Sequence, residues 1–183
     1  MIKEVFWESK EFVGCEYLQI SKNGSRILAE GRVLFATKEE ARHISYVIEM
    51  NNRWFTRNVQ VYDIGKNKSI CLQSDGKGKW FSNEKHVKEM DGAIDVDISV
   101  TPFSNTLPIN RVEWQEKQVR TFNMIYIDVH TLSLKNIEQE YTYLGAFSEG
   151  RKFRYKCREY KTIITVDETG LVLDYPDLFS RRF

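Results

Sequence analysis

The chain has 183 residues, of which 29% are charged, 42% hydrophobic and 13% aromatic. This length is typical of one domain with a buried core, so we expect a single domain over residues 1–183. With 27 basic and 26 acidic residues the net charge is only +1. This excludes the strongly basic surface of most nucleic-acid-binding domains, and we expect no nucleic-acid partner.

Residues 1–8 lack the apolar run of a signal peptide, and no apolar stretch in the chain is long enough to span a membrane. The cysteines are odd in number, far apart and outside any CxxC spacing, which indicates reduced thiols and a cytoplasmic location. They are Cys15, Cys71 and Cys157. The histidines also stand singly, without the spacing of a zinc site. They are His43, His86 and His130.

Alternation of apolar and polar residues with a period of two dominates the chain and predicts β-strands. In chain order the expected strands are 16–21, 26–35, 43–50, 54–63, 68–73, 79–81, 94–100, 119–129, 132–134, 140–144, 152–157, 162–166 and 171–174. Asn23-Gly24 predicts a hairpin between the first two. The only helical candidates are 83–90 and 176–180, each about one turn.

Strands at this spacing, with turn signals between them, are typical of an antiparallel sandwich or barrel. A closed or partly closed barrel also removes exposed sheet edges, and a barrel of eight or more strands can hold a small ligand. The expected fold class is therefore all-β, with an antiparallel meander forming an open or partly closed barrel.

Residues 91–112 form the most ordered pattern in the sequence. Four apolar side chains of residues 94–100 share one face of a strand, and Asp95, Asp97 and Ser99 share the other. Pro102 and Pro108 follow within a segment that we expect to be a rigid corner, because each proline restricts the residue before it. The corner could present polar groups of residues 101–106 to sugar hydroxyls.

Asp95 and Asp97 leave several roles open. Carboxylates two residues apart on a strand stand roughly 6.5–7 Å apart, within the range of an acid/base pair for inverting glycoside hydrolysis. They could also hold a hard cation. The alternatives are ion pairs with Arg111 or a lysine, hydrogen bonds from turn N–H groups, or a solvated face.

The same block, Asp-Gly-Ala-Ile-Asp-Val-Asp-Ile-Ser-Val-Thr-Pro-Phe-Ser-Asn-Thr-Leu-Pro-Ile-Asn-Arg, resembles the signature of a small bacterial family described as putative glycolipid-binding proteins. Residues 54–59, 140–144 and 166–179 are similar to further stretches of that family. The chain departs from the pattern at Ala93, where cysteine is usual, and at Asn110, where the first of two arginines is usual. Arg111 is then the only cation at that point.

The resemblance implies a sheet curled into a cup, similar to bacterial lipoprotein-carrier proteins that hold acyl chains. The implied ligand is a glycolipid or another amphipathic small molecule, with its tail among aromatic side chains and its head on polar groups. The candidate ligand-binding residues are Asp95, Asp97, Thr101, Asn105, Thr106, Arg111, Trp54, Arg57, Tyr141 and Tyr175. Trp80 and Tyr143 are further aromatic candidates.

The sequence contains no GxSxG elbow, Walker loop or GxGxxG, so no nucleophile and no cofactor are indicated. We therefore favour non-catalytic binding in an apolar β-cup. One alternative is a small enzyme acting on a sugar or lipid-linked substrate, with Asp95 and Asp97 as its acid/base pair. Another is an interaction module that binds a partner strand at a sheet edge. The ligand and the oligomeric state are not specified by the sequence.

Overall fold

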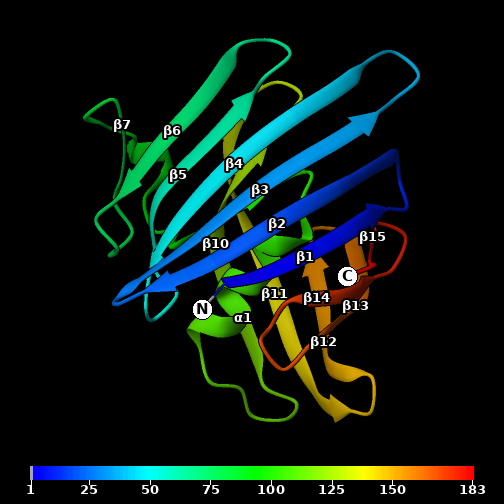
Figure 1. Ribbon diagram of the computed structural model, residues 1–183. Helices are drawn as coiled ribbons and strands as arrows, with labels where there is room; N and C mark the ends of the chain where they lie inside the picture. The colour runs from blue at the N-terminus through cyan, green and yellow to red at the C-terminus, as the bar shows by residue number, and fades with distance from the viewer. Residues whose placement is uncertain (1) are drawn as a thin grey trace.

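The computed structural model describes residues 2–183, so Met1, the first residue of the amino-terminal segment considered above, lies outside the described residues. The structure is almost entirely β (Figure 1). The elements in order are β1 Ile2–Ser9, β2 Val13–Asn23, β3 Arg26–Ala36, β4 Ala41–Asn51, β5 Thr56–Asp63, β6 Lys68–Ser74, β7 Trp80–Ser82, β8 Lys85–His86, the 3₁₀-helix η1 Lys88–Met90, β9 Asp95–Ile98, the 3₁₀-helix η2 Pro102–Asn105, α1 Thr106–Arg111, β10 Val119–Asp128, β11 Ser133–Phe147, β12 Gly150–Cys157, β13 Tyr160–Val166, β14 Val172–Tyr175 and β15 Phe179–Arg181.

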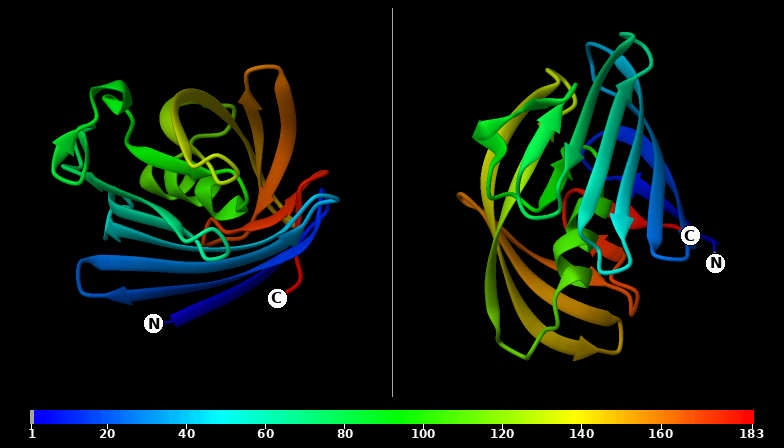
Figure 2. Two further views of the ribbon diagram at one scale, coloured as in Figure 1. Left: turned by 90° about the horizontal axis from the view of Figure 1, so that it is seen from above. Right: turned by 90° about the vertical axis from the view of Figure 1, so that its left-hand side faces the viewer.

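All strands belong to one 15-stranded sheet in the order β8-β7-β6-β5-β4-β3-β2-β1-β15-β14-β13-β12-β11-β10-β9. The first and last strands pair in the middle, with Trp7 opposite Arg181. Two arms extend from this seam: β1–β8 forms the N-terminal arm, and β15 back to β9 forms the C-terminal arm. The arms curl toward each other, and α1 lies between them (Figure 2). The prediction of an all-β open barrel is confirmed.

Alternating side chains build the core between the arms. In β3 and β4 nearly every second residue is buried, as the period of two predicts. These inward residues are Ile27, Ala29, Val33, Phe35, Ile44, Tyr46, Ile48 and Met50. Gly24, with a φ of 58°, makes the tight hairpin turn expected between β2 and β3.

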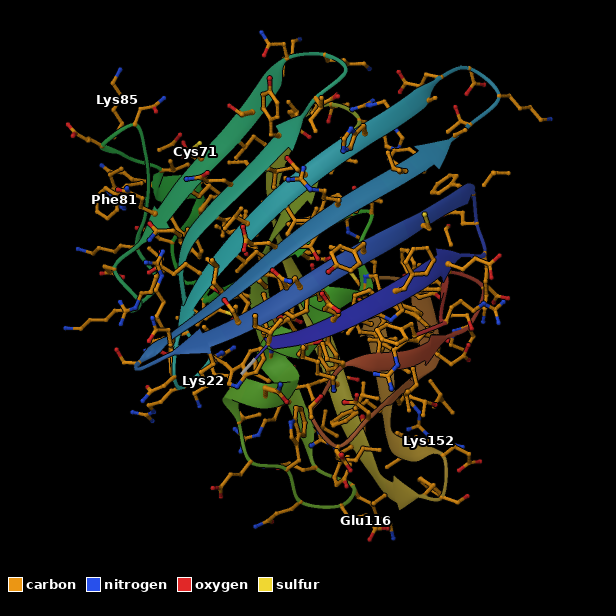
Figure 3. All side chains as sticks on the ribbon, in the orientation of Figure 1. Lys22, Cys71, Phe81, Lys85, Glu116 and Lys152 are labelled. Atoms are coloured by element: carbon orange, nitrogen blue, oxygen red, sulfur yellow. The ribbon has the colours of Figure 1, made fainter. Side chains whose placement is uncertain are left out.

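The two ends of the sheet, β7–β8 in one arm and β9 in the other, lie close together but are not paired as neighbouring strands. Gly92, just before β9, donates its N–H to the carbonyl of Gly78 at 2.9 Å. The indole Nε1 of Trp80 in β7 donates to the carbonyl of Ala93 at 2.7 Å. These bonds hold the two sheet edges together, so the barrel is partly closed by loops. Phe81 and Lys85 mark the β7–β8 edge, far from Glu116 and Lys152 at the other end (Figure 3).

The corner after β9 is helical, although its two prolines predicted a rigid turn. Thr101 has an extended backbone, as expected before proline, and its Oγ1 accepts a hydrogen bond from the Phe103 N–H at 3.0 Å. Pro102 starts η2 at the position where its missing N–H costs nothing. The η2 and α1 segments then connect β9 to β10, which pair in parallel. A parallel pair requires such a crossover.

Several other elements differ from expectation. β1 was not predicted, and the strands expected at 132–134 and 140–144 form the single strand β11. Trp54 lies in a turn with a φ of 63°, and β5 begins only at Thr56. Residues 176–180 were expected to be helical, but residues 176–178 form a turn. β15 begins at Phe179 and pairs with β1 at the seam between the arms. Between residues 2 and 183, the structure has no helix that combines the length and apolar character needed to cross a membrane.

Candidate functional site

Asp95 and Arg111 form a buried ion pair behind β9. Asp95 is fully buried, and Arg111 in the last turn of α1 reaches it with Nη2 at 2.5 Å and Nε at 3.2 Å from Oδ2. The guanidinium also lies over the rings of Phe55 and Phe122, 5.5 Å and 5.1 Å from their centroids. Burial raises the pKa of the Asp95 carboxyl, and the neighbouring Arg111 opposes that rise. This pair is therefore part of the core packing.

Asp97 lies on the same face of β9 but meets different partners. Its Oδ2 accepts a hydrogen bond from Nε2 of Gln139 in β11 at 2.6 Å. Burial raises the pKa of Asp97 to about 6, and the bond from Gln139 opposes that rise. Among residues 2–183, no side chain or backbone donor reaches its other oxygen, Oδ1.

A chain of polar side chains holds Gln139 in place. The Tyr141 hydroxyl lies 3.1 Å from Oε1 of Gln139 and 2.8 Å from Oδ1 of Asn105. The Asn105 amide in turn donates to the carbonyl of Pro102 at 3.2 Å. The helical corner is thus connected to Asp97 through three side chains, which fixes the orientation of the carboxylate.

Asp97 lines a pocket of about 440 Å³, which we call the tyrosine pocket. It lies on the C-terminal arm, where β9 to β15 bring residues distant in sequence onto one surface. Its lining residues are Glu11, Asp97, Ile98, Ser99, Thr101, Asn105, Tyr126, Ile137, Tyr155, Cys157, Tyr160, Tyr175, Leu178 and Phe179.

The tyrosine rings form a connected aromatic wall. Tyr155 lies 5.9 Å from Tyr175 and 6.3 Å from Tyr160, measured between ring centroids, and Tyr175 lies 6.4 Å from Phe179. All three of these ring contacts are edge-to-face, a favourable geometry for aromatic pairs. Burial and the nearby Asp97 raise the pKa of the Tyr155 and Tyr175 hydroxyls, so both stay protonated at neutral pH.

The structure brings four of the sequence-predicted site residues to this pocket: Asp97, Thr101, Asn105 and Tyr175. Tyr141 lies directly behind them in the polar chain.

The other five residues lie elsewhere. Asp95 and Arg111 pair with each other, and Thr106 is buried with no hydrogen-bond partner for its Oγ1 within residues 2–183. Trp54 packs at the edge of the core, and Arg57 donates to the carbonyl of Asp75 at 2.5 Å in the turn after β6. The structure therefore does not place Trp54 and Arg57 beside the tyrosine pocket.

Sequence reasoning missed a second buried carboxyl, Glu16 on β2. Its Oε1 accepts hydrogen bonds from the hydroxyls of Tyr46 and Thr101, the latter at 2.8 Å. Burial raises the pKa of Glu16 to about 8, and the two hydroxyl bonds oppose that rise. Tyr46 reaches Glu16 across Gly31, where an added Cβ would come within 2.1 Å of the ring. The sequence did contain a signal for it, because Glu16 lies two residues before the apolar Leu18 and therefore shares its inward face of the strand.

Other hollows carry a different chemistry. A larger one of about 730 Å³ is lined by charged residues, but its Asp167 is already bonded to Lys3 and Arg181 at 3.0 Å and 2.6 Å. Nowhere in residues 2–183 do three or more His, Cys, Asp or Glu side chains converge to hold a metal ion. The three cysteines are unpaired thiols, and Cys71 faces outward from β6 (Figure 3).

The fold and site define an open all-β barrel protein with a tyrosine-lined pocket in its C-terminal arm. The chain belongs to the family described as "Putative glycolipid-binding", which it matches over residues 4–181. It is also similar to the crystal structure of a DUF1089 family protein from Pseudomonas aeruginosa. The two share 27% identity over 91% of each chain, with a TM-score of 0.78. No curated protein matches the chain.

Proposed function

We propose that this protein binds an amphipathic small molecule, such as a glycolipid, non-covalently in the tyrosine pocket. The observation that carries the proposal is the combination of an aromatic wall with an oriented, half-buried carboxylate in a pocket of about 440 Å³. Small-molecule sites are typically concave and mostly apolar, with a few fixed polar groups. The family membership supports a glycolipid-like ligand.

The lining divides into an apolar and a polar part. Tyr155, Tyr160, Tyr175 and Phe179 offer ring surface to a tail or to the apolar face of a sugar. Asp97 offers a hydrogen-bonding group to a polar head, because Gln139 bonds only its Oδ2. The volume of about 440 Å³ lies within the range of small-molecule sites.

Binding is better supported than catalysis. The acid/base hypothesis requires Asp95 and Asp97 to face one cleft, but only Asp97 lines the pocket. Both Asp95 oxygens face the Arg111 guanidinium, so this carboxyl has no free position for a substrate or an attacking water. A cytoplasmic location remains a prediction, which fractionation of the native cells would test.

The test is a calorimetric titration of the protein with octyl β-D-glucoside below its critical micelle concentration. We expect saturable binding that weakens several-fold in Tyr160→Ala, because losing about 50 Å² of apolar contact costs about 1 kcal/mol. Tyr160 is 40% exposed, so its removal leaves the core intact.

Tyr62→Ala is the matched control, since Tyr62 is 36% exposed and lies on β5 in the other arm. It should bind like the parent. A folded parent that shows no saturable binding, or an equal loss in both variants, would contradict the proposed function.

A further inference from the structure

The charges that line the tyrosine pocket have one sign. Its two ionisable acids are Asp97 and Glu11, and none of its lining residues is a lysine or arginine. Lys135 and Arg158 appear only in an adjoining hollow of about 290 Å³, where Asp128 accompanies them. A ligand that enters the tyrosine pocket therefore meets negative charge and ring faces, without a cation to receive a phosphate or carboxylate.

Asp97 also has unused bonding capacity. Gln139 satisfies Oδ2, while Oδ1 has no donor within residues 2–183. An ionised carboxylate that is partly removed from water is stabilised most by a positive partner. Asp95, two residues earlier on the same face, shows the contrast because it has Arg111 as its cation.

The aromatic wall favours the same class of group. The ring centroids of Tyr155, Tyr175 and Tyr160 lie 5.9–6.3 Å from one another, and all three residues line the pocket. Cations within about 6 Å of a tyrosine ring face are attracted by its π electrons, and amine ligands are recognised in this way. The hydroxyls of these protonated tyrosines can also accept ammonium hydrogens.

We propose that the tyrosine pocket selects ligands whose polar head carries an ammonium group, which would bond Asp97 and lie among the rings of Tyr155, Tyr160 and Tyr175. This inference rests on the proposed function and specifies its ligand: an amine-bearing amphiphile, such as one with an amino sugar head, in preference to an anionic lipid. Neutral glycosides bind more weakly and anionic amphiphiles most weakly.

The experiment compares three probes whose alkyl tails differ by at most one carbon: octylammonium, octyl β-D-glucoside and octanoate. Calorimetric titrations at pH 7.5 should give octylammonium about tenfold tighter binding than octyl glucoside, with octanoate weakest. In Asp97→Asn the ratio of ammonium to glucoside affinity should fall several-fold toward one. In the matched control Asp91→Asn, which neutralises an exposed carboxylate outside the pocket, the parent's ratio should persist.

The outcomes separate the two proposals. Equal or tighter binding of the glucoside or octanoate overturns the ammonium preference and leaves the proposed function standing. The preference is also overturned if Asp97→Asn keeps the parent's ratio. No saturable binding of any probe to the folded parent overturns both. The three-probe comparison on the parent needs no variant, so it decides the question even if Asp97→Asn does not fold.

Discussion

Replacing Arg111 with alanine should strongly destabilise the fold, and the effect should depend on pH. The Asp95 side chain is fully buried and that of Arg111 is only 11% exposed. Removing one partner of a buried ion pair costs about 3–5 kcal/mol, because the remaining charge is left unpaired. The variant also loses the contacts of the guanidinium with Phe55 and Phe122.

Without Arg111, Asp95 can take up a proton and lose its charge. The electrostatic part of the destabilisation therefore cannot exceed the free energy of protonating Asp95 at the given pH. Each pH unit above the ordinary pKa of 3.8 adds about 1.4 kcal/mol to the cost of keeping a carboxyl protonated, or about 4 kcal/mol at pH 7. Loss of Arg111 raises the folded-state pKa of Asp95 further, so folding takes up a proton. The destabilisation should therefore shrink as the pH falls, to about 2 kcal/mol at pH 5.

Urea unfolding of the parent, Arg111→Ala, Asp95→Asn and the double variant at pH 5 and pH 7 measures these quantities. The double variant should be more stable at pH 7 than Arg111→Ala alone, because it contains no unpaired buried charge. Two results would show that Arg111 and Asp95 do not form a stabilising buried pair: an Arg111→Ala protein as stable as the parent, or a destabilisation that is equal at both pH values.

Two other perturbations test the core around Glu16. The folded-state pKa of Glu16 is about 8, above its ordinary value of 4.5. The stability that this difference contributes is complete below pH 4.5 and is lost progressively as the pH rises to 8. The free energy of unfolding of the parent should fall by up to about 1.4 kcal/mol per pH unit between pH 6.5 and 8. This range lies above the pKa of Asp97, about 6, so that Asp97 contributes little to the slope. Urea unfolding of Glu16→Gln should show a flatter pH profile, and slopes identical to those of the parent would contradict this. Gly31→Ala should cost about 1–3 kcal/mol, because the new Cβ collides with the Tyr46 ring. Gly65→Ala, whose Cβ meets nothing closer than 3.6 Å, should change the midpoint of urea unfolding little, and equal effects of the two changes would show that the Tyr46 contact is unimportant.

Most strands were predictable because alternation is a local signal, although β1, β8 and β15 were not predicted. Residues 43–50 alternate, with Val47 as the one apolar residue on the outward face, and β4 covers them. The helix at Thr106–Arg111 was missed because two prolines and an Asn-Thr pair were interpreted as a rigid turn. The Thr101-Pro102 dipeptide was the overlooked signal, since a capping residue followed by proline favours a helix start. The parallel pairing of β9 with β10 depends on contacts that no local pattern contains.

The candidate site was only partly predictable for the same reason. Asp97, Thr101 and Asn105 stand close together in sequence, so one motif revealed them. Tyr155 and Tyr160 come from neighbouring strands and join the pocket only when the C-terminal arm folds. Asp95 and Asp97 share a face but differ in role because Arg111 bonds only the first, a distinction that strand periodicity does not encode.

The proposed function assigns amphiphile binding to the tyrosine pocket. Backbone amide spectra of ¹⁵N-labelled protein, recorded while octyl β-D-glucoside is added, test it most directly. We predict saturable shifts concentrated at residues 97–101, 155–160 and 175–179, which line or adjoin the pocket. Saturable shifts confined to the hollow around Lys3, Arg151 and Arg181, or no shifts at any concentration below micelle formation, would contradict binding in the tyrosine pocket.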